Sequence, residues 1–176
     1  MARAASAKPK SARQVATAYF EAIADRDIEA MMQLWEPGGY GHMYGMASLR
    51  APDGYRQWFG NLFRAFPDFL FEVTDMVAYG DKAAVRWRAR GTFNGPGKFE
   101  GLLPTGSRIE LEGLDLLTIR DGLIRENRAY TNATEMARQL GAMPPAGSVG
   151  EKLMLGAVNL RTAALAAARR LLDRGR

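Results

Sequence analysis

The sequence of 176 residues contains no cysteine and only one histidine. The absence of thiols excludes disulfides, thiolate nucleophiles and zinc–thiolate sites, and a single imidazole is a poor basis for any other metal site. No glycine-rich loop that could cradle a phosphate precedes a predicted helix. We therefore expect this protein to need neither a metal nor a cofactor for its function.

Long apolar runs are also missing from the chain. No stretch approaches the roughly 20 apolar residues that cross a bilayer, and the basic N-terminal residues lack the apolar centre of a signal peptide. We expect a cytoplasmic protein without stable membrane insertion. The formal net charge is +5, but the basic residues gather at the two ends of the sequence. Because no basic face or known module is visible, we expect no nucleic-acid partner.

The composition is that of an ordinary folded domain, with 47% apolar and 24% charged residues. Residues 1–10 form a basic arm that we expect to be disordered, and residues 11–143 form the domain. Residues 144–150 have the composition of a linker. Residues 151–176 are predicted to be a C-terminal helical extension. This extension could pack on the domain, pair with another subunit or lie on a membrane surface, and the pattern favours the first two.

Three helices are predicted in the first half of the domain. The first begins after Ser11, a good N-cap, and its apolar spacing turns Tyr19 towards the core. The second is predicted over residues 28–35, with Asp27 as its cap and a stop at the following Pro-Gly-Gly. Residues 40–49 are expected to form a short strand and a loop. The third helix covers about residues 53–66 and carries a wide aromatic stripe.

From residue 69 onward the apolar residues recur with a period of two, which predicts strands. Strands are expected over residues 69–77 and 83–92, and two longer strands fill residues 108–132 on either side of a turn at Asp121-Gly122. In the predicted strand over residues 83–92, one face is apolar and the other carries three arginines. A short helix is expected over residues 136–140.

Asp115 is the most unusual residue of these strands. It shares an alternating face with Ile109, Leu111, Gly113, Leu117 and Ile119, so we expect its carboxylate to lie among apolar side chains. A buried carboxylate is costly unless its pKa rises or it finds donors, which makes Asp115 the first candidate for chemistry. The alternative is a bulge at Gly113, which would turn Asp115 outward into a loop cap or an ion pair.

The order of these elements resembles the NTF2-like superfamily and, within it, the SnoaL-like polyketide cyclases, also called ester cyclases. The stretches that carry the resemblance are AYFEAIADRDIEAMMQLW, AFPDFLFEV, AAVRWRARGTFNG, LPTGSRIELEGLDLLTIRDGLI and YTNATEMARQLG. The resemblance implies an α+β fold, a cystatin-like cone in which a curved antiparallel sheet packs against three helices, here followed by the C-terminal helical extension. It also implies a homodimer formed through the sheet face.

The resemblance assigns roles to four residues. Tyr19 and Asp115 match the tyrosine and the pocket carboxylic acid of ketosteroid isomerases, which donate hydrogen bonds to an enolate oxygen. The general base of those enzymes falls near His42, which we infer to be the base here. Asn132 stands where epoxide-hydrolase-like relatives place the aspartate that activates water. An amide cannot accept that proton, so epoxide hydrolysis is disfavoured.

The function implied is cofactor-independent acid/base chemistry next to a carbonyl, either an aldol-type cyclisation or an isomerisation, on a small hydrophobic polyketide- or steroid-like molecule. The pocket is expected to be apolar with few polar groups. Asn127 is the alternative to Tyr130 and Asn132 if the other face of the last strand is inward. The rival functions are a non-catalytic binding protein on the same scaffold and a pure dimerisation module. The predicted substrate-binding residues are Trp35, Tyr44, Trp58, Phe63, Phe66, Trp87, Asn127 and Tyr130.

Overall fold

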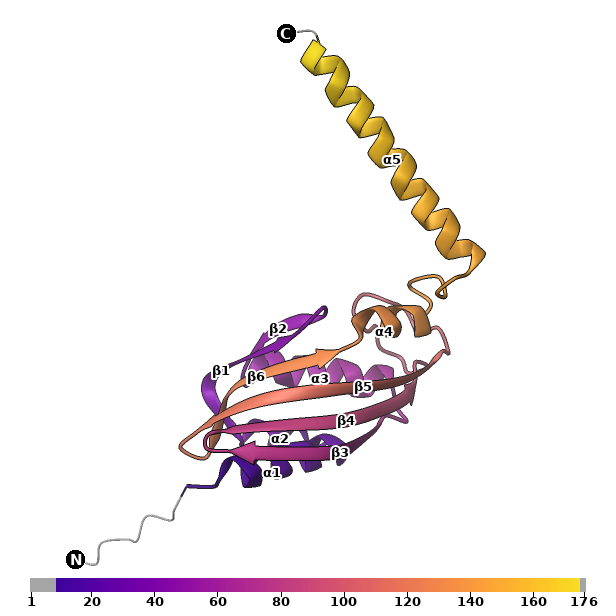
Figure 1. The fold of residues 1–176 in the computed structure, drawn as a ribbon. Helices are drawn as coiled ribbons and strands as arrows, with labels where there is room; N and C mark the ends of the chain where they lie inside the picture. Colours follow the sequence, from indigo (N-terminus) through magenta and orange to yellow (C-terminus); the bar gives the residue numbers. More distant parts are fainter. Residues whose placement is uncertain (1–8, 175–176) are drawn as a thin grey trace, which may run out of the picture.

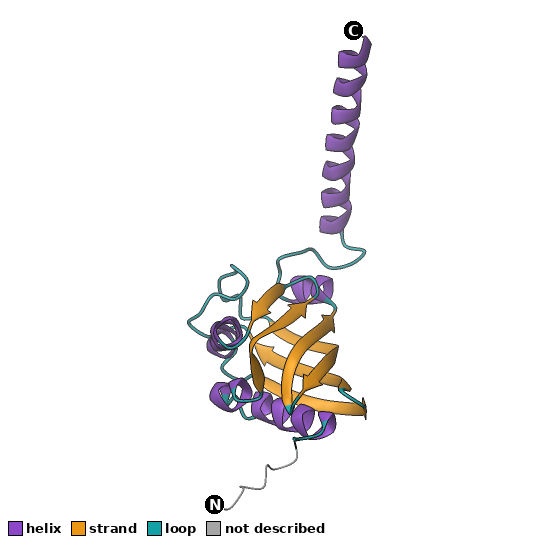
Figure 2. Cartoon of the chain, turned by 90° about the vertical axis from the view of Figure 1, so that its left-hand side faces the viewer, coloured by secondary structure: helices purple, strands orange, loops and turns teal. Residues whose placement is uncertain are grey.

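The computed structural model describes residues 9–174, so most of the basic arm predicted to be disordered lies outside the described residues. One six-stranded sheet carries helices on one side (Figures 1 and 2). The elements are α1 (Ala12–Ala24), α2 (Ile28–Met32), β1 (Trp35–Met43), β2 (Ala47–Arg50), α3 (Asp53–Ala65), β3 (Leu70–Tyr79), β4 (Lys82–Thr92), β5 (Arg108–Arg120), β6 (Leu123–Thr131), α4 (Ala133–Gln139) and α5 (Val149–Arg174).

The sheet has the strand order β2-β1-β6-β5-β4-β3. Its inner face is covered by α1, α2 and α3, and α4 lies at one end of β5 and β6 (Figure 1). The predicted α+β class and curved sheet are confirmed. One detail differs, because β1 pairs with β6 in parallel while all other neighbours are antiparallel. The parallel pair brings a strand from the first quarter of the chain next to the last hairpin.

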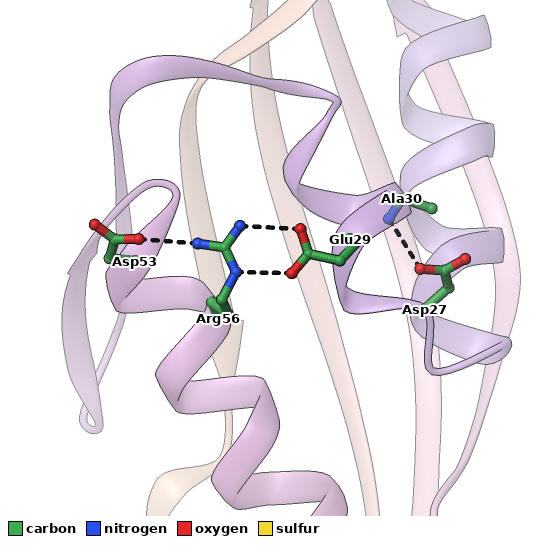
Figure 3. Close-up of polar contacts among 5 residues, drawn as sticks. All are labelled: Asp27, Glu29, Ala30, Asp53 and Arg56. Atoms are coloured by element: carbon green, nitrogen blue, oxygen red, sulfur yellow. Dashed lines mark hydrogen bonds and ion pairs between the residues drawn. The ribbon is translucent and has the colours of Figure 1, made fainter.

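The short helix α2 depends on side chains for its stability, since five residues are too few to be helical alone. Asp27 caps it by accepting a hydrogen bond from the Ala30 backbone N–H at 2.9 Å. Arg56 of α3 then makes a two-point ion pair with Glu29 at 2.8 and 3.0 Å and a third contact with Asp53 (Figure 3). These contacts tie α2 to α3.

The prediction of a helix over residues 28–35 is wrong at its end. The helix stops at Met32, and Trp35 opens β1, where it pairs with Ile124. The Pro-Gly-Gly segment lies inside the strand, at an irregularity between Trp35 and Tyr40. A side chain on Gly39 would overlap the Trp35 ring, so this glycine is needed because the indole folds back over the strand. The predicted strand and loop over residues 40–49 are the end of β1 and the hairpin partner β2.

The hairpin of β5 and β6 follows the prediction closely. Asp121 and Gly122 both have positive φ, 50° and 80°, as a two-residue turn of this twist requires. Gly113 causes no bulge, and β5 stays in regular register with β4 along its whole length. The irregularity is instead on β6, where Arg125 is an extra residue between Ile124 and Glu126.

Helix α5 projects away from the domain (Figure 1). Its first turn is anchored by an ion pair between Glu151 and Arg138 at 2.8 Å. Leu153 and Leu160 are 69% and 74% exposed, so the helix does not pack on its own domain, contrary to one of the predicted options. Pairing with another subunit stays a prediction. Among the described residues no helix combines the length and apolarity of a membrane span.

Candidate functional site

A cavity lies between the inner face of the sheet and helices α1 and α3. Its volume is about 80 Å³, measured as the space that the centre of a water molecule can occupy. One water needs roughly 10–15 Å³ on this measure, so the cavity has room for several waters or for part of a small organic molecule. Its wall is mainly apolar. The residues that line it include Phe20, Trp58, Leu62, Trp87, Leu111 and Met136.

Asp115 is the only charged residue among the described residues that line this cavity. It is 6% exposed, so its inward orientation, predicted from strand alternation, is confirmed. Both oxygens accept a hydrogen bond from a neutral donor. Trp87 Nε1 donates to Oδ1 at 2.8 Å, and Asn127 Nδ2 donates to Oδ2 at 2.6 Å. Each oxygen keeps a further lone pair for a ligand.

Burial raises the pKa of Asp115 from 3.8 to about 6, against the opposing effect of the hydrogen bonds from Asn127 and Trp87. Burial dominates because the cavity provides no cation to replace the lost hydration of the carboxylate. A carboxyl group with this pKa is largely ionised at neutral pH and is still a useful base. It can take up and return a proton near physiological pH.

Tyr19 lines the same cavity from α1. It is 1% exposed, and its ring packs edge-on against Trp35 with 6.0 Å between ring centroids. Burial, with a further contribution from the negative charge of Asp115, raises the pKa of Tyr19 far above its ordinary value. The phenol therefore keeps its proton over the physiological pH range. Towards an anionic oxygen it acts as a hydrogen-bond donor. The structure brings the predicted pair Tyr19 and Asp115 to one cavity.

The glycine of β5 explains how Trp87 reaches Asp115. Gly113 and Trp87 are cross-strand partners on the inner face. A methyl group on Gly113 would overlap the Trp87 indole, so the indole lies flat across the space that a side chain would fill. From there its N–H reaches the carboxylate two residues along the strand. The residue that suggested a bulge is thus required for close packing at the site.

Asn127 occupies the inner face of β6 and is 2% exposed. The extra residue Arg125 shifts the alternation, so Ile124 and Asn127 point to the same side. The structure therefore places Asn127, the predicted alternative, in the cavity lining, and it places Tyr130 outside it. Tyr130 is 41% exposed on the outer face, where it stacks on Tyr44 with 4.4 Å between ring centroids. Tyr44 also lies outside the cavity.

The placement of His42 in the pocket is wrong as well. His42 pairs with Arg128 across β1 and β6, while its neighbours Gly41 and Met43 are buried on the inner side. Its Nδ1 contacts the hydroxyl of Ser48 at 2.7 Å on the outer face. The resemblance places His42 near the general base of ketosteroid isomerases, but one residue of strand parity decides which face of the sheet it occupies.

Asn132 is exposed and caps α4, where its Oδ1 accepts a hydrogen bond from the Glu135 N–H at 3.0 Å. It therefore does not reach the cavity, and no water-activating role follows from its position. Arg86 and Arg88 of β4 are also on the outer face, where both pair with Glu112. These placements give no support to epoxide-hydrolase-like chemistry.

Of the aromatic residues predicted as pocket walls, Trp58 and Trp87 line the cavity. Trp35, Phe63 and Phe66 are buried in the core around it instead. Trp35 packs on Tyr55, and Phe66 stacks on Phe93. Phe20, Met43, Thr131 and Met136 also line the cavity, although they were not among the predicted substrate-binding residues. Apolar periodicity marks such residues as inward but cannot separate the cavity wall from solid core.

Metal ligands are not grouped in the described part of the chain. Among residues 9–174, no cluster of three or more histidine, cysteine, aspartate or glutamate side chains is close enough to hold a metal ion. The polar lining residues supply a carboxyl, a carboxamide, a phenol and a threonine, and the indole N–H of Trp87 is held by the carboxyl group. Such a set can bind and polarise a carbonyl group and can transfer a proton.

Comparison with known proteins agrees with this arrangement. The family model for SnoaL-like polyketide cyclases matches residues 13–140. No curated protein sequence matches the chain significantly. Similar solved structures include a proposed SnoaL-like polyketide cyclase from Jannaschia sp. CCS1, with a TM-score of 0.68 and 21% identity over 82% of this chain and 100% of that one.

Two Streptomyces proteins are also similar. IdmH of Streptomyces antibioticus, a proposed polyketide cyclase, has a TM-score of 0.62 and 28% identity over 75% of this chain and 99% of its own. AclR of Streptomyces galilaeus, a proposed hydroxylase, has a TM-score of 0.65 and 24% identity over 89% of this chain and 95% of its own. At these identities the Jannaschia and AclR structures support the fold alone.

Proposed function

The chain belongs to the SnoaL-like polyketide cyclase family, and from this premise we propose that it catalyses a cofactor-independent, aldol-type ring closure of a small hydrophobic molecule. The observation that carries the proposal is a buried carboxyl group with a pKa of about 6 that faces an apolar cavity together with a protonated tyrosine. Asp115 is proposed as the general base, which replaces the role first given to His42.

In the first step, the ionised Asp115 removes a proton from a carbon next to a carbonyl group of the substrate. The electron pair of the C–H bond moves to the carbonyl oxygen and gives an enolate. The Tyr19 hydroxyl donates a hydrogen bond to this oxygen, which is favourable because the charge develops in an apolar, water-poor site. Asp115 ends the step protonated.

In the second step, the enolate carbon attacks another carbonyl carbon of the same molecule and forms a C–C bond. The resulting alkoxide takes the proton from Asp115, which regenerates the carboxylate. The product has the same atoms as the substrate, so the sequence needs no water, oxidant or metal. If the second carbonyl is absent and the proton returns to a different carbon, the same groups perform an isomerisation.

The role of Asp115 in this scheme differs from the neutral donor that the resemblance to ketosteroid isomerases implies. Both carboxylate oxygens accept hydrogen bonds from N–H groups, which favours the ionised form. A protonated carboxyl group would accept these two hydrogen bonds more weakly than the carboxylate does. The proposal therefore assigns the enolate oxygen to Tyr19 and the proton transfer to Asp115.

The alternative function is a non-catalytic binding protein for a similar small hydrophobic molecule. It is favoured by the positions of His42 and Asn132 outside the cavity. Among the described residues, tyrosine is then the only other ionisable group type that lines the cavity beside Asp115. In that case Asp115, Asn127 and Tyr19 would serve only to orient polar groups of the ligand.

Hydrogen–deuterium exchange tests the proposal without knowledge of the natural substrate. The protein is incubated in D₂O with a panel of small apolar ketones and 1,3-diketones, and the loss of the α-proton signal is followed by NMR. General-base catalysis should make exchange on at least one compound roughly 10²- to 10⁴-fold slower in Asp115→Asn than in the wild type. Because the base must be ionised, the wild-type rate should fall as the pH drops below about 6.

Glu112→Gln is the matched control, since it removes a carboxylate from the outer face of the same strand and should leave exchange unchanged. Equal exchange in the wild type and in Asp115→Asn, on compounds that both proteins bind, would contradict catalysis and support the binding protein. The predicted homodimer is a separate proposal that sedimentation equilibrium can test.

A further inference from the structure

Two polar atoms near the candidate base are buried without a hydrogen-bond partner. They are the Tyr55 hydroxyl and Asn127 Oδ1, and both belong to residues that are at most 2% exposed. The other end of the same amide is engaged, because Asn127 Nδ2 donates to Asp115 at 2.6 Å. A buried donor and a buried acceptor without partners are uncommon in folded proteins and point to an interaction that matters for the site.

Both atoms belong to residues that meet at the same position of the sheet, where β1 and β6 are neighbours. Gly41 of β1 and Asn127 of β6 are register partners, and the Tyr55 hydroxyl from α3 lies directly above Gly41. A methyl group on Gly41 would overlap that hydroxyl, so the glycine creates the space that it occupies. Burial raises the pKa of Tyr55 well above its ordinary value, while contact with the Asn127 amide acts in the opposite direction.

We propose that Tyr55 is a positioning residue, whose hydroxyl donates to Asn127 Oδ1 and thereby holds the amide nitrogen of Asn127 against Asp115. This hydrogen bond would satisfy both buried atoms, neither of which has a partner among the described residues. The role of Tyr55 in catalysis rests on the proposed function of Asp115 as a base. The positioning itself is a property of the folded protein without substrate.

The physical reason is that an asparagine amide can sit in two orientations related by a flip. In one orientation its N–H₂ group faces Asp115 and stabilises the carboxylate. In the other orientation its oxygen faces Asp115 and accepts a hydrogen bond from the protonated carboxyl. A hydroxyl can both donate and accept, but a phenol is the stronger donor, so the Tyr55 hydroxyl beside Asn127 favours the first orientation. Without the Tyr55 hydroxyl the flipped amide becomes accessible, and the protonated form of Asp115 is favoured.

No other charged group of the described residues faces Asp115 in the cavity. From α1 the titratable neighbour is Tyr19, from β4 the neighbour is the neutral donor Trp87, and from β6 it is the neutral Asn127. Tyr55 lies behind Asn127 on α3. The titration of Asp115 should therefore respond to these few groups, which makes the effect of one hydroxyl measurable.

The test is a pH titration of the Asp115 carboxyl carbon by NMR, in the full chain labelled with ¹³C-aspartate and assigned with Asp115→Asn. Tyr55→Phe should raise the titration midpoint from its wild-type value of about 6 by roughly 0.5 units or more. Tyr79→Phe is the matched control, because Tyr79 is 91% exposed at the far end of β3 and should leave the midpoint unchanged.

A second pair of variants separates positioning from a general loosening of the fold. Asn127→Leu alone should raise the midpoint, and Tyr55→Phe added to Asn127→Leu should raise it no further. The proposal is overturned if Tyr55→Phe leaves the midpoint unchanged or lowers it, or if its effect is the same with and without Asn127.

A measurement on the wild type needs no variant. The hydroxyl proton of Tyr55 should exchange slowly with solvent and show a nuclear Overhauser effect to the Asn127 side-chain amide, and the lack of both signals in a folded spectrum would also overturn the proposal. Because the titration uses no substrate, a failure of the deuterium-exchange experiment would leave this result intact, and the two proposals can fail separately.

Discussion

The two faces of strand β5 place two carboxylates in opposite environments. Asp115 is buried on the inner face and accepts hydrogen bonds from two neutral N–H groups, and its pKa is raised to about 6. Glu112, three residues earlier on the outer face, pairs with Arg88 at 2.7 Å and Arg86 at 3.2 Å. The hydrogen bond from Arg88, followed by that from Arg86, holds the pKa of Glu112 below its ordinary value.

The comparison shows why only one of these residues is suited to acid/base chemistry. An arginine partner keeps a carboxylate ionised and weakly basic, which stabilises structure but leaves little tendency to take a proton. The neutral donors Trp87 and Asn127 hold the Asp115 carboxylate in place but lower its basicity less than an arginine would. The sheet thus separates a structural ionic face from a face on which a carboxyl group can titrate near neutral pH.

The largest expected effect concerns the pH dependence of stability. Below pH 3.8 Asp115 is protonated in both the folded and unfolded states, and above about pH 6 it is ionised in both. Between these values the folded state binds more protons, so this group lowers stability as the pH rises. The free energy of unfolding of Asp115→Asn relative to wild type should increase by about 2.4 kcal/mol from pH 4 to pH 7.5, at about 1.4 kcal/mol per pKa unit. Urea unfolding at both pH values measures this.

Glu112→Gln is the control for this experiment and should give the opposite sign. The lowered pKa of Glu112 stabilises the wild type above its unfolded-state pKa, and this contribution is lost as the pH falls. The variant should therefore lose a small amount of stability relative to wild type at neutral pH, and added salt should reduce the difference. The same sign for both variants would show that the two faces do not differ as described.

An intermediate effect is expected from Gly113→Ala. The added methyl group must displace the Trp87 indole, which strains the inner face and breaks the hydrogen bond to Asp115. Overpacking of this kind typically costs about 1–3 kcal/mol, which urea unfolding can detect. The near-ultraviolet circular dichroism of the tryptophans should change, and the Asp115 titration midpoint should rise because a donor is lost.

Gly60→Ala provides the matched glycine control, since no neighbouring atom lies within 4 Å of the added methyl group and the residue is within α3. That variant should be as stable as wild type or slightly more stable, because alanine favours helix. If Gly113→Ala behaved in the same way, the proposed close packing of Trp87 across β5 would be wrong.

The smallest effect is expected from His42→Ala. Because His42 contacts Ser48 on the outer face and does not line the cavity, the deuterium-exchange rate should stay within about twofold of wild type. The exchange assay with the responsive ketone measures this directly. A loss of tenfold or more would restore His42 as a catalytic candidate and would remove the distinction between the two faces.

The sequence by itself determined the fold class, the family, the long hairpin and the inward orientation of Asp115. The hairpin and the orientation of Asp115 follow from local periodicity, because side chains alternate along a regular strand and β5 is regular throughout. The family rests instead on the resemblance of several stretches that occur in the same order. The turn at Asp121-Gly122 was also predictable from local sequence, because these two residue types favour a tight hairpin turn. The third helix was equally clear from its apolar stripe.

Only the tertiary structure decided which polar residues accompany Asp115. One extra residue in β6 turned Asn127 inward and Tyr130 outward, and the parity of β1 placed His42 on the outer face. From the sequence, Gly113 could indicate either a β-bulge or a site where another group packs closely against the backbone. The structure shows the second, because the Trp87 indole lies against Gly113. Bulges and cross-strand packing depend on residues that are distant in the chain, so no local pattern could have fixed them.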